Sequence, residues 1–399
     1  MEHTSFRSSR VVLPDLVSSV SSVGVTNARI GELSGDRAVS DPDYESVTVF
    51  PGFIDVHIHG AAGIDVNEAD ADGLLQIAAF LAKNGVTAWM PTVVPDSDEN
   101  YRRTIDELDR LMELQKGKAV AQAVGVHYEG VFANEKMCGA LRPEYFRDAK
   151  ERTTPSAQSG DHPSFVRRGA SGLPRLQNGV HMTTMAPEID GGVELIEELV
   201  ADGWIVSIGH TRADAETLER AYAAGARHMT HFFNAMTGVH HRDLGVAGWG
   251  LAKRDVTFDI IADGIHVHPD MVRVACRSKT PDNVSLISDS VAPTGLGDGE
   301  YALWGETITV EDGRTQNERG SIAGSVITMH DAVRRMLSLG FSEVEVAKMA
   351  STNPGRLLGL NDRGAIEVGK RADLVGIDAA GNIAFTMIGG QIVFAEARA

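Results

Sequence analysis

Histidines and carboxylates of the kinds that bind metal ions follow short apolar runs at widely separated points of this 399-residue chain. They are His57, His59, Glu129, His210, His231 and Asp289. The first two follow the apolar segment 47–54 and stand two positions apart, so on a strand both side chains point to the same side. In a (β/α)8 barrel the carboxyl ends of all strands open onto one face, which gathers residues that are distant in sequence. This pattern therefore predicts such a barrel.

Strand-like and helix-like segments alternate between about residues 51 and 350, as the barrel requires. The spacing of apolar residues predicts a strand over 86–92 and helices over 71–84, 101–115, 193–201 and 214–224. Both ends of the chain instead contain short β-like pieces broken by glycine and aspartate. We therefore predict an α/β fold, with a (β/α)8 TIM-like barrel over 51–355 and a small β-sandwich domain formed by residues 1–50 and 356–399.

One long segment breaks the alternation. Residues from about 149 to 180 are rich in serine, glycine, proline and arginine, with little apolar periodicity. Structureless connections of this length are uncommon within compact domains. The segment is therefore expected to be either an active-site lid or a disordered insertion.

Composition excludes several classes of protein. The net charge of −18 argues against a nucleic-acid partner, whose phosphates require a basic surface. There is no run of about 18 apolar residues that would predict a membrane span. The N-terminus lacks the apolar core of an export signal. Only two cysteines are present, so no disulfide framework is expected and a reducing cytoplasm fits.

The candidate ligands also have ordinary explanations when taken singly. A lone glutamate after a strand is usually a solvated loop residue, and Asp289 could be a helix N-cap. Together, the candidate histidines and Glu129 supply nitrogen and carboxylate ligands of the type that holds a zinc-like ion with one position open for water. Beside such an ion, Asp289 is the expected proton shuttle.

Several motifs carry a family resemblance. The run 51–60, Pro-Gly-Phe-Ile-Asp-Val-His-Ile-His-Gly, resembles the entry motif of the amidohydrolase superfamily. Five further blocks resemble the N-acetylglucosamine-6-phosphate deacetylases within it: Glu129–Gly130, Gly209–Thr211, Thr230–Met236, Ile261–Val267 and Gly324–Met329. The resemblance covers about residues 45–395, and the segment 364–377 is similar to the superfamily's returning β-sandwich.

This resemblance implies a metal-dependent hydrolysis of N-acetylglucosamine 6-phosphate to glucosamine 6-phosphate and acetate. It implies that Glu129, His210 and His231 hold the principal divalent metal, with zinc expected. Some members use the His57 and His59 pair for a second ion, so one or two ions per subunit are expected. Asp289 matches the catalytic aspartate. The positions that bind the sugar and its phosphate are Asn234, Ala235, Arg242 and His266. Relatives are commonly homodimers.

Two departures from the family pattern concern the substrate. The glutamate motif continues with Val131 where the family usually has proline, and Leu141 stands where the family has a substrate-facing histidine. Three alternatives therefore stay open. They are a deacetylase of another amino sugar such as N-acetylgalactosamine 6-phosphate, an N-acetyl amino-acid or cyclic-amide hydrolase, and a non-catalytic scaffold.

Overall fold

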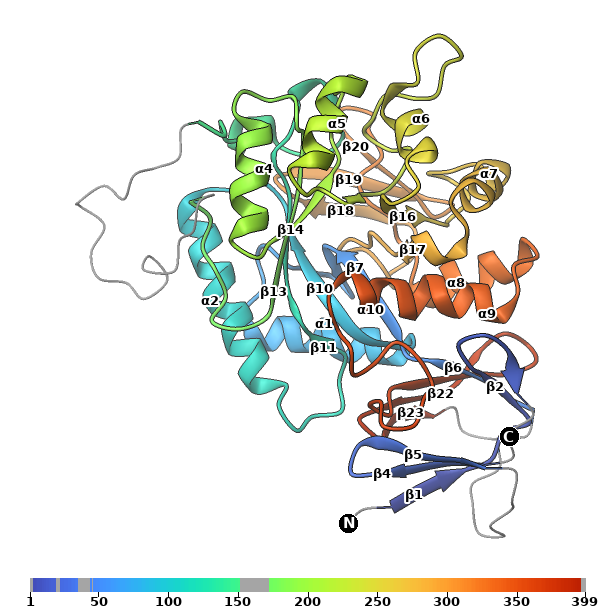
Figure 1. Ribbon diagram of the computed structural model, residues 1–399. Helices are drawn as coiled ribbons and strands as arrows, with labels where there is room; N and C mark the ends of the chain where they lie inside the picture. The colour runs from blue at the N-terminus through green and yellow to red at the C-terminus, as the bar shows by residue number, and fades with distance from the viewer. Residues whose placement is uncertain (1–2, 19–21, 35–43, 45, 151–171, 396–399) are drawn as a thin grey trace.

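A computed structural model of the chain describes residues 3–18, 22–34, 44, 46–150 and 172–395. Within these residues, parallel strands follow one another around a nearly closed barrel (Figure 1). They are β7 (Phe53–Ile58), β10 (Val86–Val93), β12 (Gly125–Phe132), β13 (Val180–Met185), β14 (Ile205–Ile208), β15 (His228–Met229), β16 (Thr257–Ile261) and β17 (Val284–Ile287). A parallel bridge between Ile58 and Ser290 joins the first strand to the end of the last. The predicted (β/α)8 barrel is confirmed.

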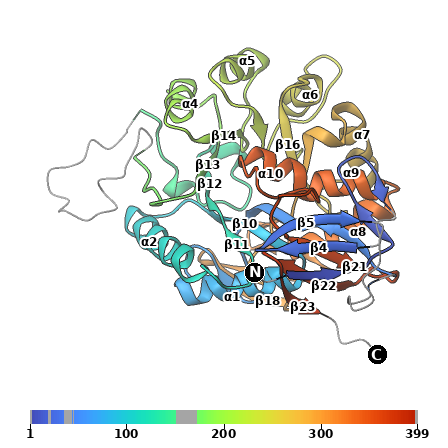
Figure 2. The ribbon, with the colours of Figure 1, turned by 60° about the horizontal axis from the view of Figure 1, so that its bottom comes forward.

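Helices surround this barrel (Figure 2). They are α1 (Ala71–Lys83), α2 (Asp98–Leu114), α4 (Gly192–Ala201), α5 (Ala215–Ala223), α6 (Gly245–Ala252), α7 (Pro269–Lys279), α8 (Met329–Ser338), α9 (Glu343–Ala347) and α10 (Asn353–Leu357). Helix α1 buries Leu74, Ile77 and Leu81, which repeat at helical spacing. The predicted helices are confirmed, but α2 begins three residues before its predicted start, because the Ser97 side chain caps it by accepting from the N–H of Asn100.

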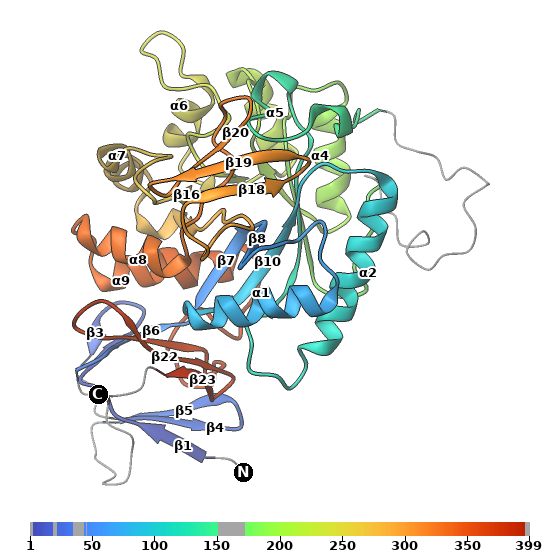
Figure 3. The ribbon, with the colours of Figure 1, turned by 180° about the vertical axis from the view of Figure 1, so that it is seen from behind.

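The two ends of the chain form one small sheet domain (Figure 3). One sheet contains β1 (His3–Phe6), β4 (Ser22–Thr26) and β5 (Arg29–Ser34). The other has the order β23 (Gln391–Ala395), β22 (Ile383–Ile388), β21 (Leu374–Ile377), β6 (Thr48–Pro51), β2 (Arg10–Val12) and β3 (Val17–Ser18). Phe6, Val25 and Phe385 belong to the apolar core of this domain. The predicted terminal β domain is confirmed, and its boundaries at residues 50 and 356 stay predictions.

A three-stranded antiparallel sheet follows β17 and was not predicted. It comprises β18 (Gly299–Leu303), β19 (Glu306–Glu311) and β20 (Arg314–Asn317). Figure 3 shows it across the end of the barrel that faces away from the small domain. Leu303 and Ile308 of this sheet share an apolar cluster with Leu141, which follows β12.

Shorter elements complete the described chain. They are β8 (Gly60–Ala61), β9 (Ile64–Asp65), β11 (Gln122–Ala123), the 3-10 turns Glu135–Met137, Pro143–Tyr145 and Pro281–Asn283, and a π-helical turn over Lys348–Thr352. Most of the segment 149–180, expected as a lid or a disordered insertion, lies outside the described residues. Of the helices in the described ranges, none combines the length and apolarity needed to cross a bilayer.

Candidate metal centre

The ends of four barrel strands carry the candidate ligands to one place. His57 lies on β7 and Glu129 on β12, while His210 and His231 follow β14 and β15. Asp289, which follows β17, completes the group. His210, His231 and Asp289 have positive φ angles of 48°, 32° and 50°. Such backbone conformations are uncommon for residues other than glycine and cluster at functional sites.

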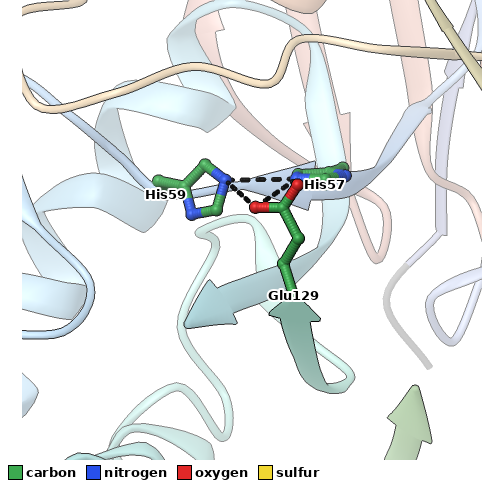
Figure 4. A group of neighbouring side chains, drawn as sticks. All are labelled: His57, His59 and Glu129. Carbon is green, nitrogen blue, oxygen red and sulfur yellow. Dashed lines mark hydrogen bonds and ion pairs between the residues drawn. The ribbon is translucent and has the colours of Figure 1, made fainter. Parts of the chain in front are cut away.

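Glu129 lies between two pairs of histidines. Its Oε1 atom is 3.0 Å from Nε2 of His210 and 2.9 Å from Nε2 of His231. Its Oε2 atom faces the other pair, at 3.0 Å from Nε2 of His59 and 3.5 Å from Nε2 of His57 (Figure 4). All five side chains are buried. Glu129 is therefore shared by two adjacent ligand sets, and either set could hold a metal ion.

Asp289 lies beside His57 and His59. Its Oδ1 atom lies 3.4 Å from Nε2 of His57 and 3.3 Å from Nε2 of His59. The side chain is buried but also lines the cavity described below. No helix begins at Asp289, so the alternative of an N-cap is wrong.

The hydrogen bonds on the far side of two histidines suit metal binding. Nδ1 of His59 donates to the carbonyl oxygen of Thr92 at 3.2 Å, and Nδ1 of His210 donates to that of Met137 at 2.7 Å. Because a carbonyl oxygen can only accept, these bonds place the proton on Nδ1 and leave the Nε2 lone pair directed at Glu129. This arrangement is typical of metal-binding histidines, so the residues present fit a divalent cation.

The buried carboxylates of Glu129 and Asp289 make the site favourable for positive charge. Burial opposes ionisation of Glu129, yet the charge on His57 and hydrogen bonds from His210 and His231 hold its pKa well below the usual range. Burial likewise lowers the pKa of His59, but the carboxylates of Asp289 and Glu129 raise it to about 10. A divalent cation can supply this positive charge by binding the Nε2 lone pairs, which protons on the imidazoles would otherwise occupy.

Two buried aspartates that were not predicted as site residues orient the ligand segments. Asp55 accepts a hydrogen bond from Oγ of Ser288 at 2.5 Å and one from the backbone N–H of His57 at 3.3 Å. Asp259 accepts from the backbone N–H of His231, and it also binds Nε2 of His228 at 3.1 Å. Asp259 lies on β16, which pairs with β15, and no spacing rule in the sequence links it to His231.

A cavity of about 310 Å³ opens onto the ligands. Its lining residues are His59, Glu129, Gly139, Ala140, Leu141, His210, His231, Asn234, Ala235, Ile261, His266, Asp289, Trp304, Ser321, Ile322 and Gly324. The structure thus brings three of the predicted substrate residues, Asn234, Ala235 and His266, beside the metal ligands. Nδ1 of His266 is held by Asp263 at 2.6 Å.

Arg242 is the one predicted site residue that lies elsewhere. It is exposed on the loop before α6, where its guanidinium contacts Nε2 of His241 at 2.8 Å. No lysine or arginine of the described chain lines the cavity. Leu141, by contrast, is in the cavity wall, as its place at the family's substrate-facing position predicts.

Trp304 is a cavity residue that sequence reasoning missed. Its Nε1 atom donates to Oδ2 of Asp65 at 3.0 Å, and its ring packs edge-on against His59 with centroids 5.2 Å apart. The only local signal was Asp312–Gly313, a dipeptide that favours a tight hairpin turn in the same small sheet. That signal predicts the turn between β19 and β20, but it does not locate the turn between β18 and β19 that contains Trp304.

Known proteins of similar sequence and structure share this arrangement of elements. A profile of the Amidohydrolase family matches residues 48–393. An N-acetylglucosamine-6-phosphate deacetylase of Bacillus subtilis is 32% identical over 381 residues, which cover 93% of this chain and 92% of that protein. An N-acetylgalactosamine-6-phosphate deacetylase of Escherichia coli O157:H7 is 31% identical, covering 89% and 90%.

A solved structure also matches over the whole chain. It is a mutant N-acetyl-D-glucosamine-6-phosphate deacetylase of Mycobacterium smegmatis in complex with N-acetyl-D-glucosamine-6-phosphate. The two chains share 28% identity and superpose with a TM-score of 0.86, over 99% of this chain and 100% of the other. The similarity therefore includes both the barrel and the small sheet domain.

Proposed function

The chain belongs to the amidohydrolase family, within the branch of the N-acetylglucosamine-6-phosphate deacetylases, and we propose that it hydrolyses N-acetylglucosamine 6-phosphate. The products are glucosamine 6-phosphate and acetate. The observation that carries this proposal is the cavity that holds Asp289 beside the Glu129 ligand sets and also contains Asn234 and His266. The groups that would hydrolyse an amide and the polar residues that would bind a sugar thus line the same cavity.

The metal is proposed from the donor set. Glu129, His210 and His231 would hold the principal ion, and His57 with His59 would hold a second one. Nitrogen and carboxylate donors favour zinc. When bound, such an ion lowers the pKa of water from 15.7 toward about 7 and polarises a carbonyl oxygen.

Asp289 performs the proton transfers in this proposal. It accepts a proton from the attacking water as the water oxygen bonds to the acetyl carbonyl carbon. The resulting tetrahedral intermediate cannot expel nitrogen as an amide anion. Asp289 therefore returns the proton to that nitrogen as the C–N bond breaks, which releases the free amine and leaves Asp289 ionised for the next cycle.

Polar residues of the cavity wall would position the sugar. Asn234 and His266 offer hydrogen-bonding groups, and the Asp263 carboxylate fixes the ring of His266 through Nδ1. Arg242 is our candidate for the phosphate, because a guanidinium offers paired donors that match phosphate oxygens. Arg242 is exposed, so it is accessible to an anionic ligand.

A second amino sugar is a specific alternative. The Escherichia coli relative is named for N-acetylgalactosamine 6-phosphate and is nearly as similar to this chain as the Bacillus subtilis one. An N-acetyl amino-acid or cyclic-amide hydrolase would not need the sugar-binding residues Asn234 and His266 in its cavity. A non-catalytic scaffold would not need the full set of metal ligands together with Asp289. A homodimeric assembly and a cytoplasmic location complete the proposal, the first because relatives are commonly dimers and the second because the cysteine content fits a reducing compartment.

Acetate release by the metal-loaded protein tests the proposal. The substrates are N-acetylglucosamine 6-phosphate, N-acetylgalactosamine 6-phosphate, both unphosphorylated sugars and N-acetyl amino acids, with metal content measured in the same samples. We expect the highest kcat/KM for N-acetylglucosamine 6-phosphate and loss of activity after chelation. A higher kcat/KM for the galactose isomer or for an amino acid would replace the proposed substrate.

A further inference from the structure

Trp304 adopts a backbone conformation that its residue type disfavours. Leu303 pairs with Glu306, so Trp304 and Gly305 form a two-residue hairpin turn between β18 and β19. Their φ angles are 52° and 80°. Turns with two positive φ angles favour glycine, asparagine or aspartate, whereas a bulky side chain is strained there.

The turn places the indole ring at the reacting end of the cavity. Trp304 is only 8% exposed, and its Nε1–H is satisfied by Asp65. The ring meets His59 edge-on at an interplanar angle of 80°. A strained residue persists when its surroundings hold it in place, and here they hold it against a candidate metal ligand.

Leu141 extends this apolar surface. Leu141 and Trp304 line the cavity and belong to one apolar cluster. Leu141 is 3% exposed and lies so close to Gly130 that a Cβ atom there would come within 2.2 Å of Cδ1 of Leu141. Both Leu141 and Trp304 are buried, so this part of the wall is closely packed.

An apolar wall beside the ligands fits the alkyl part of the acyl group of an N-acyl sugar phosphate. The reacting carbonyl carbon must lie next to the ligands and Asp289, and its alkyl substituent is one bond away. The sugar hydroxyls need hydrogen-bonding partners, which Asn234 and His266 of the same cavity offer. We propose that Trp304 and Leu141 form the acyl-binding wall and limit the N-acyl group to acetyl, an inference that rests on the proposed deacetylase function.

The test compares acyl chains on one sugar. The kcat/KM values for N-acetyl, N-propionyl and N-butyryl glucosamine 6-phosphate are measured for the wild type and for Trp304→Gly, whose glycine accepts the positive φ angle. Asp312→Gly is the matched control, because Asp312 has a φ of 49° in the other turn of the same sheet and is exposed outside the cavity. Trp304→Asn, which also suits this turn, provides a second variant should the glycine one unfold.

We expect Trp304→Gly to raise the ratio of kcat/KM for the butyryl substrate to that for the acetyl substrate by at least about tenfold. One methylene in an apolar pocket is worth about 10–200-fold in discrimination. Asp312→Gly should leave the ratio at its wild-type value. An unchanged ratio in both Trp304 variants, or an equal loss for all acyl chains that places the indole against the sugar, would overturn the inference alone. A wild type inactive on every chain would instead overturn the proposed function, and this inference with it.

Discussion

Replacing Asp289 by asparagine separates proton transfer from metal binding. The change preserves the size of the side chain and one oxygen, but the amide cannot accept and return a proton. Asp289 lies 3.4 Å from Nε2 of His57 and 3.3 Å from Nε2 of His59, whereas the Glu129, His210 and His231 set does not include it. The variant should therefore retain its principal metal while its turnover falls.

The expected loss follows from the groups that remain in the cavity. Glu129 is engaged by four imidazoles, and His266 is held by Asp263, so neither can readily take over both proton transfers. General acid–base catalysis is typically worth about 10²–10⁴-fold, or roughly 3–5 kcal/mol of activation free energy. Because Asp289 acts in both steps, we expect kcat to fall by at least about 10³-fold.

The assay follows acetate release and measures metal by elemental mass spectrometry in the same preparation. Asp270→Asn provides the control, since it makes the same chemical change at an exposed position at the start of α7. An Asp289→Asn protein that retained more than about a tenth of wild-type kcat would refute the proton-transfer role. Loss of the principal metal together with activity would make Asp289 a ligand of that ion instead.

Three further predictions address other parts of the molecule. Replacing His57 and His59 together by alanine should remove about one metal equivalent by elemental analysis, because the other ligand set is intact; an unchanged content would indicate a single-ion site. Arg242→Ala should raise KM for the 6-phosphorylated sugar and barely change kcat/KM for its unphosphorylated analogue, whereas equal losses on both would exclude a phosphate contact. Burial raises the pKa of the Cys276 thiol to about 12, so at pH 8 only about one part in 10⁴ is thiolate. Iodoacetamide should therefore alkylate half-buried Cys138 in the folded protein and Cys276 only after unfolding, as peptide mass spectrometry would show; rapid labelling of native Cys276 would contradict its burial.

Local periodicity predicted the parts of the site that depend on single strands. His57 on β7 and His59 directly after it stand two residues apart, and their Nε2 atoms are indeed 3.1 Å apart. The barrel interpretation also predicted that the more distant His210 and His231 would approach each other, and their Nε2 atoms lie 3.0 Å apart. These predictions succeeded because the fold itself determines where the strand ends meet.

The contacts that were missed depend on how separate segments pack. Trp304 reaches the cavity only because a hairpin folds over the barrel mouth, and its partner Asp65 is far away in sequence. Asp259 supports His231 from a neighbouring strand without any spacing rule that links them. The position of Arg242 depends on a surface loop, where a family motif fixes the residue type but not the direction of the side chain.

The order of strands in the small domain has a consequence for biosynthesis. Strand β6 pairs on one side with β2, which leaves the ribosome before it, and on the other with β21, which emerges more than 300 residues later. At about 5–20 residues per second, the β6 edge would stay unpaired for roughly 15–60 s, while the barrel strands are translated. An unpaired edge of this kind can pair with another chain. Newly made chains that stop before Leu374 should therefore depend most on chaperones, since only the final segment covers this edge.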